Sequence, residues 1–226
     1  VLDWREDVSD IRRDLSIANY QYTDTKKSLW VAGASDTDES AAEKDADPTK
    51  AQKNKQNYTP AKWDIQKYVT TNSINNDKSN VNWYFLRYAD VLLLYAEVLN
   101  EWKHGPDAEA YNAINAVRRR GYGNPSNTSA CDLPQGLDET SFREAVRKER
   151  SYELSFEGHR RQDLIRWGIY YKTVQATAKE LGYWWEGTGS PNYSVATYTE
   201  EGKHELFPIP QRDMDLCIQF NQNPKW

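Results

Sequence analysis

Two acidic residues interrupt an apolar helical stripe in the second half of this 226-residue chain. Glu149 and Glu153 are four positions apart and share a helix face with apolar residues such as Phe142. An ionised carboxylate that leaves water costs several kcal/mol unless a cation or several donors meet it. Cations are plentiful nearby, namely Arg118, Arg119, Arg120, Arg150, Arg160, Arg161 and Arg166. The pattern therefore predicts a partly buried network of Glu–Arg ion pairs that clamps helices together.

The same two carboxylates could instead act as the acid and base of a glycoside hydrolase. That chemistry needs two carboxyl groups about 5 to 9 Å apart across an open cleft. Neighbours on one helix have roughly that separation in any protein, so the spacing does not discriminate. The surrounding guanidinium groups are expected to keep Glu149 and Glu153 ionised, which removes the acid. Ion pairing is therefore the favoured interpretation.

Other residues with metal-binding or redox chemistry are sparse. His159 and Asp163 are four residues apart and could share a metal ion, but no third ligand is spaced to join them, so we expect a hydrogen-bonded pair. The acidic stretch 35–50 lacks the ligand spacing and the glycine of a calcium loop and is interpreted as a solvated segment. Cys131 and Cys217 are too few for a metal site, and either two free thiols or one pairing fits them. The sequence predicts no metal and no cofactor.

Helices must position the two carboxylates. Periodic apolar residues predict a helix over 84–101, which is apolar nearly all round and is therefore expected to be covered on more than one side. The breaker His104-Gly105-Pro106 separates it from a second helix over 108–120, which Asp107 caps, so the two form an antiparallel hairpin.

A second helical pair follows in the sequence. Ser141 and Glu144 match a capping box that starts the carboxylate helix, and after a turn at Glu157-Gly158 a further helix is predicted from about His159 to Leu181. Two such hairpins resemble a tetratricopeptide-type array, although the strict repeat signature is absent. The predicted fold class is mainly α, with tetratricopeptide-like helical hairpins and long irregular loops.

The overall composition narrows the function. A net charge of −5 argues against nucleic acid as a partner, because a duplex binder needs a basic stripe. The sequence contains no apolar run of about 18 residues that could span a membrane. The chain is hydrophilic yet holds 9 Trp and 15 Tyr, which indicates a compact core with polar loops that display aromatic rings. The loop excursions are predicted at 23–58 and 182–204.

Four sequence blocks occur in an order that resembles the C-terminal half of the SusD/RagB family. They are LRYADVLLLYAEVLNE (Leu86–Glu101), AINAVRRRGYG (Ala113–Gly123), FREAVRKERSYELSFEGHRRQDLIRWG (Phe142–Gly168) and LFPIPQRDMDLCIQFNQNPKW (Leu206–Trp226). Two further stretches, 12–22 and 61–68, agree more loosely. The resemblance implies that residues 1–226 are the C-terminal portion of a single SusD-like domain.

The resemblance also implies a function. Proteins of this family are surface-exposed, lipid-anchored lipoproteins of the Bacteroidetes outer membrane that capture nutrients, most often glycans, without catalysis. Their partner is a SusC-like TonB-dependent transporter. No lipid-anchoring cysteine is found in this chain, which we interpret as a fragment, so any membrane contact depends on an anchor that the fragment lacks.

Carbohydrate recognition points to aromatic residues in the loops. A pyranose ring has an apolar face that stacks on flat aromatic rings flanked by polar side chains. Four tryptophans lie in polar, unpatterned surroundings and are the predicted ligand platforms, namely Trp4, Trp30, Trp184 and Trp185. Trp184 and Trp185 are adjacent and in an extended segment point to opposite faces, so at most one of them meets the ligand. Trp102 and Trp167 lie in or beside helices and are predicted to be in the core.

Two other function classes remain as alternatives. A helical-repeat scaffold for protein interaction would use a concave groove lined by polar side chains. An all-α glycoside hydrolase would need a carboxylate pair in an open cleft.

Overall fold

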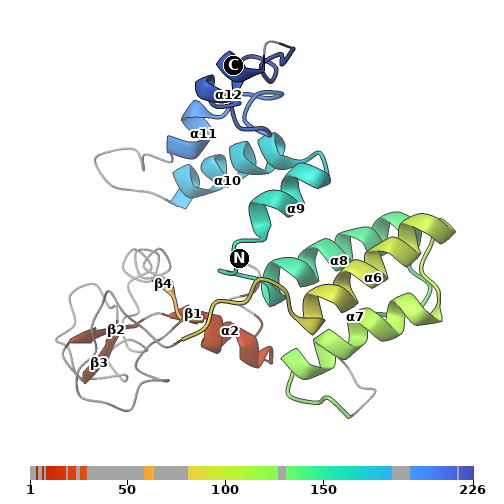
Figure 1. Ribbon diagram of the computed structural model, residues 1–226. Helices are drawn as coiled ribbons and strands as arrows, with labels where there is room; N and C mark the ends of the chain where they lie inside the picture. Colours follow the sequence, from red (N-terminus) through yellow and green to blue (C-terminus); the bar gives the residue numbers. More distant parts are fainter. Residues whose placement is uncertain are drawn as a thin grey trace. The chain divides into compact units, whose positions relative to one another are not determined.

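The computed structural model describes residues 4, 7, 9–18, 20–23, 26–29, 59–63, 81–126, 131–184, 194–217 and 219–226 (Figure 1). Its contacts divide the chain into two compact units, Val1–Arg160 and Arg161–Trp226, and each unit is described by itself. Helices make up most of the regular structure in the described ranges, which confirms the prediction of a mainly α fold. The assignment of residues 1–226 to a single domain stays a prediction.

Three helices form the body of the first unit. They are α6 (Tyr88–Lys103), α7 (Ala108–Gly121) and α8 (Glu139–Glu153), and they lie side by side in Figure 1. The predicted hairpin of α6 and α7 is confirmed. α6 ends at His104, whose φ of 54° is left-handed, and the Asp107 side chain accepts a hydrogen bond from the backbone N–H of Ala110 at the start of α7.

The start of α8 differs from the prediction. The Asp138 side chain accepts a hydrogen bond from the backbone N–H of Ser141, so the helix begins at Glu139. The predicted capping box of Ser141 and Glu144 is therefore wrong. An aspartate at the N-cap satisfies the same unpaired N–H groups as a serine, and Asp138 lies one position before the helix.

The core of the first unit lies between these helices. Its fully buried members include Leu93 of α6, Ile114 of α7 and Phe142 of α8, and the Tyr111 ring meets the Phe142 ring edge-on with 5.1 Å between centroids. Only one face of α6 enters this core. The opposite face is exposed, so the prediction that α6 is covered on more than one side is wrong within the part of the chain that the structure describes.

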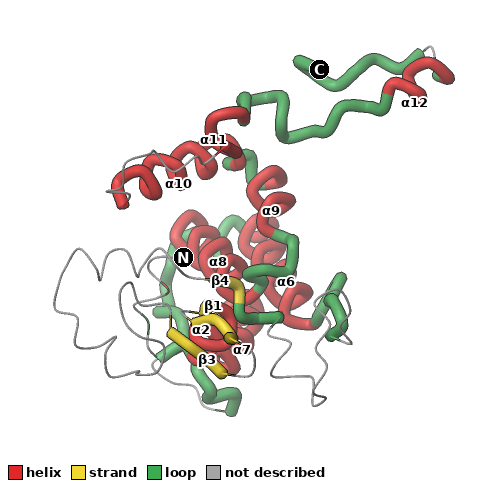
Figure 2. The backbone as a smooth tube through the Cα atoms, turned by 90° about the vertical axis from the view of Figure 1, so that its left-hand side faces the viewer, coloured by secondary structure: helices red, strands yellow, loops and turns green. Residues whose placement is uncertain are grey.

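Short elements flank the three helices. α2 (Ile11–Ser16) runs into β1 (Ile17–Ala18), which pairs antiparallel with β4 (Thr59–Pro60) so that Ile17 lies opposite Pro60. β2 (Tyr20–Thr23) pairs antiparallel with β3 (Lys26–Leu29). These strands, yellow in Figure 2, are not predicted by the sequence analysis. The predicted excursion 23–58 thus begins with strand residues, and its residues 30–58 lie outside the described residues.

The second unit follows with α9 (Arg160–Arg166), α10 (Tyr170–Trp184), α11 (Ser194–Tyr198) and α12 (Gln211–Leu216). The single helix predicted from His159 to Leu181 is wrong, because the chain breaks at Gly168, whose φ is 67°. The predicted excursion 182–204 includes the end of α10 and the whole of α11.

Side chains hold the C-terminal segment of this unit. The Arg161 guanidinium lies 4.4 Å from the Phe207 ring centroid and donates to the backbone carbonyl of His204. The Gln222 amide accepts a hydrogen bond from the backbone N–H of Ile209 at 2.7 Å and donates to its carbonyl at 2.9 Å. The extended segment that contains Ile209 is therefore fixed in the manner of a strand pair, with a side chain in place of the second strand.

Candidate functional site

The predicted Glu–Arg network is present in the first unit and has Arg12 of α2 at its centre. Arg12 Nη1 donates to Glu149 Oε1 at 2.7 Å and to Glu153 Oε2 at 2.8 Å, and Nη2 donates to Asp10 Oδ2 at 2.6 Å. Both glutamates are buried on α8, and Arg118 of α7 donates to the second oxygen of Glu149 at 2.9 Å. The network therefore ties α2, α7 and α8 together through charge-assisted hydrogen bonds.

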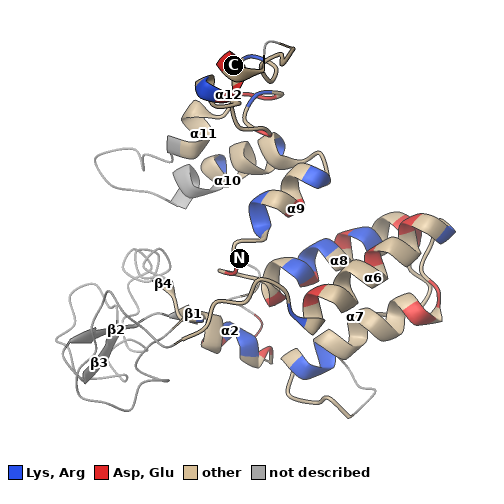
Figure 3. Cartoon of the chain, in the orientation of Figure 1, with Lys and Arg blue, Asp and Glu red and all other residues tan. Residues whose placement is uncertain are grey.

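Further cations complete the network on the side of α6. Arg87 donates to Glu153 through Nη1 and to Glu157 Oε2 through Nε at 2.7 Å. Arg120 also donates to Glu153, and Lys62 donates to Glu157. Figure 3 shows the basic residues at the end of α7 and the charges of both signs along α8. Every carboxylate of this network thus has at least one cationic partner.

The electrostatics of Glu153 bear on catalysis. Burial by itself raises the pKa of this carboxyl, but the charge of Arg87 and the hydrogen bond from Arg12 hold the pKa below its ordinary value. Glu153 therefore stays ionised near neutral pH and cannot donate a proton. The arrangement fits the predicted structural role of the Glu149 and Glu153 pair, because an ionised Glu153 does not provide the protonated carboxyl group that a glycoside hydrolase uses.

A pocket of about 330 Å³ opens beside the network. It is lined by Arg12, Leu15, Ser16, Lys62, Tyr84, Arg87, Arg120 and Glu153. Small-molecule sites usually have volumes of about 300 to 1,000 Å³, so this pocket lies at the lower end of the range. Its lining combines hydrogen-bond donors with the ring of Tyr84. Such a mixture suits a ligand that carries several hydroxyl groups.

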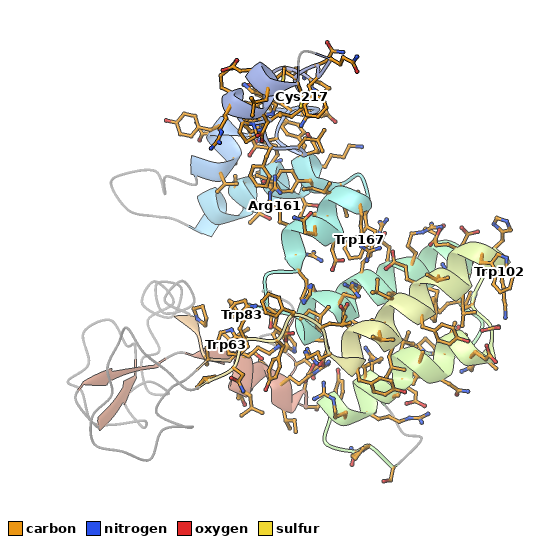
Figure 4. All side chains as sticks on the ribbon, viewed as in Figure 1. Trp63, Trp83, Trp102, Arg161, Trp167 and Cys217 are labelled. Carbon is orange, nitrogen blue, oxygen red and sulfur yellow. The ribbon has the colours of Figure 1, made fainter. Side chains whose placement is uncertain are left out.

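The Tyr84 ring, which lines this pocket, belongs to a cluster of three aromatic rings. Trp63 stacks on Trp83 with 4.7 Å between ring centroids and 17° between planes, and it meets the Tyr84 ring at 5.8 Å. Trp63 Nε1 donates to the backbone carbonyl of Phe156 at 2.9 Å, which fixes its ring. Trp83 and Tyr84 are about half exposed. Figure 4 labels Trp63, from the segment after β4, and Trp83, from the segment before α6. We call Trp63, Trp83 and Tyr84 the aromatic rim.

Trp4, one of the four predicted ligand platforms, occupies a different environment from the one expected. Its side chain is only 1% exposed and stacks on Tyr152 of α8 with 4.8 Å between centroids. Trp4 Nε1 donates to Asp10 Oδ2 at 2.9 Å. The expectation of an open loop tryptophan is therefore corrected, because both faces of the ring are covered by protein and its N–H is satisfied. Trp4 connects the core to the ion-pair network.

The other three predicted platforms stay predictions. Trp30 and Trp185 lie outside the described residues, and Trp184 is the last residue of α10 with a side chain that is also outside them. Trp102 was expected in the core, and this prediction is wrong for the described structure, since Trp102 is largely exposed at the end of α6.

The aromatic rim was not predicted from the sequence. Trp83 and Tyr84 lie in the short segment before α6, which begins at Tyr88, and the periodic pattern had placed the start of that helix at residue 84. One signal was present in the sequence. The run Trp83-Tyr84-Phe85 puts three aromatic side chains at consecutive positions, which no single apolar face of a helix can bury.

Among the described residues, no group of three or more His, Cys, Asp and Glu side chains could hold a metal ion. Asp163 forms an ion pair with Arg166 at 2.9 Å, and the pairing of Asp163 with His159 stays a prediction. Cys131 is buried and Cys217 is exposed, and no disulfide joins them. None of the described helices is long and apolar enough to span a bilayer.

Comparison with protein families gives a match over nearly the whole chain. The SusD family model, SusD_RagB, matches residues 3–226. Among curated proteins, SusD-like protein P25 of Formosa agariphila is 39% identical over 130 residues, which cover 58% of this chain and 21% of that protein. SusD-like protein P2 of the same organism is 35% identical over 92 residues, which cover 41% of this chain and 18% of that protein.

A solved structure is also similar. The crystal structure of a SusD homologue from Bacteroides thetaiotaomicron matches with a TM-score of 0.90 and 99% sequence identity. The match covers 100% of this chain and 42% of the homologue's chain. The chain therefore spans less than half of the length of each relative named here.

Proposed function

Because the chain belongs to the SusD family, we propose that it is part of a non-catalytic cell-surface protein that binds glycans and delivers them to a SusC-like TonB-dependent transporter. Proteins of this family in general bind glycans for nutrient uptake and are surface lipoproteins of the outer membrane. We propose the same properties for the protein that contains residues 1–226. It is exposed on the cell surface and is held at the outer membrane by a lipid anchor.

The aromatic rim beside the charged pocket is the observation that supports a glycan site in this chain. Trp83 is 52% exposed and is backed by the Trp63 ring, so its outer surface is available for the apolar face of a pyranose. Arg120 lines the adjoining pocket, its side chain is 54% exposed, and its guanidinium has five N–H donors, so it can donate hydrogen bonds to hydroxyl groups or to an acidic substituent. In this proposal one sugar ring stacks on Trp83, and its polar edge faces the pocket.

The absence of catalysis in this proposal rests on the state of the carboxylates. Glu153 lines the pocket, but Arg12, Arg87 and Arg120 all donate to it, and it stays ionised. Retaining and inverting glycosidases both need a protonated carboxyl group as the general acid. The site as described can hold a sugar by stacking and hydrogen bonding and has no group placed to protonate a glycosidic oxygen.

Replacing Trp83 with alanine is expected to weaken binding of the preferred glycan by about 1 to 3 kcal/mol, by analogy with the loss of a base-stacking ring. Trp83→Phe keeps a flat ring and should retain most of the affinity. The measurement is titration calorimetry of the intact, natural-length protein with a panel of neutral and acidic oligosaccharides. Tyr198→Ala is a matched control, because Tyr198 is an exposed aromatic residue that neither belongs to the rim nor is among the residues that line the pocket. Equal affinities of wild type and Trp83→Ala would show that the aromatic rim is not part of the glycan-binding site.

The remaining loop tryptophans are proposed as further platforms for the same glycan. Alanine at Trp30 is expected to lower the affinity by roughly 1 to 3 kcal/mol, and alanine at Trp184 and at Trp185 should do so at only one of the two positions. The same titrations measure these effects. Unchanged affinity for all three variants would show that these tryptophans do not contact the glycan, so that the aromatic rim makes the aromatic contacts of this chain.

A further inference from the structure

Basic side chains dominate the lining of the pocket beside the ion-pair network. Among the described residues that line it, four are cations and one, Glu153, is a carboxylate. The cations are Arg12, Lys62, Arg87 and Arg120. A cleft lined mainly by one sign of charge raises the local concentration of ligands of the opposite sign, because its walls screen the field less than water does. The lining therefore favours an anionic ligand wherever one of these cations still has donors to offer.

Three of the four cations are already satisfied by protein groups. Every nitrogen of the Arg12 and Arg87 guanidinium groups donates a hydrogen bond to a carboxylate or to a backbone carbonyl. The Lys62 ammonium has three N–H donors, and two backbone carbonyls and one carboxylate accept from it. These side chains hold the ion-pair network together and have little donor capacity left for a ligand.

Arg120 is the exception among these cations. Its side chain is 54% exposed, and its Nη2 donates a hydrogen bond to Glu153. In the part of the chain that the structure describes, its Nε and Nη1 have no acceptor. Glu153 also accepts from Arg12 and Arg87, so three guanidinium groups share the single charge of one carboxylate. Arg120 is therefore the lining cation whose charge is least neutralised and whose donors are most available.

Tyr84 connects this cation with the proposed sugar platform. Its ring lines the same pocket as Arg120 and lies 5.8 Å from the Trp63 ring within the aromatic rim. A sugar that stacks on the rim therefore has its ring substituents next to the pocket. Oxyanions are the substituents that suit a guanidinium best, because its charge-assisted hydrogen bonds to anionic oxygens are roughly twice as strong as hydrogen bonds between neutral groups.

We propose that this pocket makes the protein selective for acidic glycans, with Arg120 pairing with an oxyanion on the sugar that stacks on the aromatic rim. This selectivity rests on the proposed glycan-binding function and adds the substrate class to it. The oxyanion is either the carboxylate of a uronic acid or a sulfate ester, since both present anionic oxygens to the guanidinium. A neutral sugar can stack on the same rings but brings no counter-ion for Arg120.

Titration calorimetry of the intact protein with matched pairs of oligosaccharides tests the proposal. One pair is an oligogalacturonide and its neutral methyl ester, and the other is a sulfated galacto-oligosaccharide and its desulfated form. The wild type is expected to bind the acidic member of at least one pair about 10- to 100-fold more tightly, which corresponds to one hydrogen bond with a charged group. The pair that shows the preference identifies the oxyanion. Added salt should reduce the preference, because it screens exposed charges.

Substitutions at the end of α7 show whether Arg120 causes the preference. Arg120→Gln keeps a hydrogen-bonding side chain and removes the charge, so the preference for the acidic member should disappear. Arg120→Lys keeps the charge and should retain part of it. Arg119→Gln is the matched control, because it removes the same charge from the neighbouring residue, which pairs with Asp132 and is not among the residues that line the pocket. This control should keep the preference of the wild type. Arg120→Gln is expected to fold, since Arg120 is half exposed and Glu153 keeps two other guanidinium partners.

The outcomes separate this selectivity from the glycan-binding function itself. Equal affinities for both members of each pair, or tightest binding of a neutral oligosaccharide from a wider panel, would overturn the selectivity and leave glycan binding standing. A preference that survives in Arg120→Gln would show that another group pairs with the oxyanion and would equally overturn the proposal. If this variant does not fold, the matched pairs measured with the wild type still decide. No binding of any oligosaccharide would contradict the proposed function, and the acidic selectivity with it.

Discussion

Replacing Glu153 with alanine is expected to lower the free energy of unfolding of the intact protein by about 3 to 5 kcal/mol. This carboxylate is buried and accepts hydrogen bonds from Arg12, Arg87 and Arg120. Its removal leaves the positive charges of Arg12 and Arg87 in a poorly solvated place with fewer anions to balance them. The loss should appear as a shift of the urea unfolding midpoint without a change in the slope of the transition.

Two further variants make this expectation specific. Glu153→Gln keeps the shape of the side chain and removes only its charge, so it should retain part of the hydrogen bonding and lose less stability than alanine. Glu144→Ala on the same helix breaks one exposed ion pair, with Arg147, and should change the stability by no more than about 0.5 kcal/mol. A Glu153→Ala variant with wild-type stability would show that the network does not hold the helices.

The effect of Glu153 should also depend on pH in a defined direction. Although burial opposes it, the charge of Arg87 keeps the native pKa of Glu153 below the ordinary value of 4.5. A carboxyl with a lowered native pKa contributes stability above its ordinary pKa and loses that contribution as the pH falls through the native value. The difference in stability between wild type and Glu153→Gln is therefore expected to shrink on acidification below about pH 4.5.

Replacing Trp4 with alanine is expected to cost about 3 to 5 kcal/mol of unfolding free energy, because it empties a fully buried site. The ring stacks on Tyr152, and its N–H donates to Asp10, which also holds Arg12. Trp4→Phe keeps an aromatic ring but leaves Asp10 without that donor, so a smaller loss of about 1 to 3 kcal/mol is expected. Urea unfolding of both variants measures these losses.

Trp83→Ala provides the matched control for Trp4→Ala. Trp83 is half exposed, so its removal should weaken glycan binding and leave the unfolding free energy nearly unchanged. Trp4→Ala should lower the unfolding free energy. At a lower temperature, where this variant is folded, it should bind the glycan with the affinity of the wild type. A Trp4→Ala protein with wild-type stability and weakened glycan binding would return Trp4 to the role of ligand platform that the sequence suggested.

Local signals explain which parts of the fold could be predicted. The breaker at His104-Gly105-Pro106 and the cap at Asp107 act within a few residues, and the hairpin of α6 and α7 follows from them. Gly168 was a comparable local signal, but the predicted helix continued through it because apolar residues recur at helical spacing on both sides. Its left-handed φ ends the predicted long helix and gives α9 and α10.

The ion-pair network shows which contacts a local sequence pattern can predict and which it cannot. Glu149 and Glu153 interrupt an apolar stripe, and this pattern predicted buried carboxylates that need cationic partners. The arginines at the end of α7 were correctly expected among these partners. Arg12 lies 137 residues from Glu149 in sequence, and Lys62 lies 91 residues from Glu153. No local period connects residues at such separations, so these partners could be found only in the folded structure.

Contacts between residues that are far apart in the sequence also explain why some predictions for single aromatic residues were wrong. Trp4 has no apolar stripe around it in the sequence, and its partner Tyr152 is on α8, far along the chain. For Trp102 and the outer face of α6 the pattern correctly marks apolar residues, but it does not distinguish the face that enters the core from the face that is exposed. The rim residue Tyr84 was assigned to a helix that begins only at Tyr88, and Trp83 is the residue before that predicted helix.

Titration calorimetry of the intact protein with a panel of neutral and acidic oligosaccharides tests the central claim most directly, since one trace distinguishes binding from turnover. For at least one glycan the account predicts heat pulses that saturate and return to the baseline after each injection, as expected for binding without chemistry. A sustained heat flow that persists until the sugar is consumed, or no heat with any glycan of the panel, would contradict it.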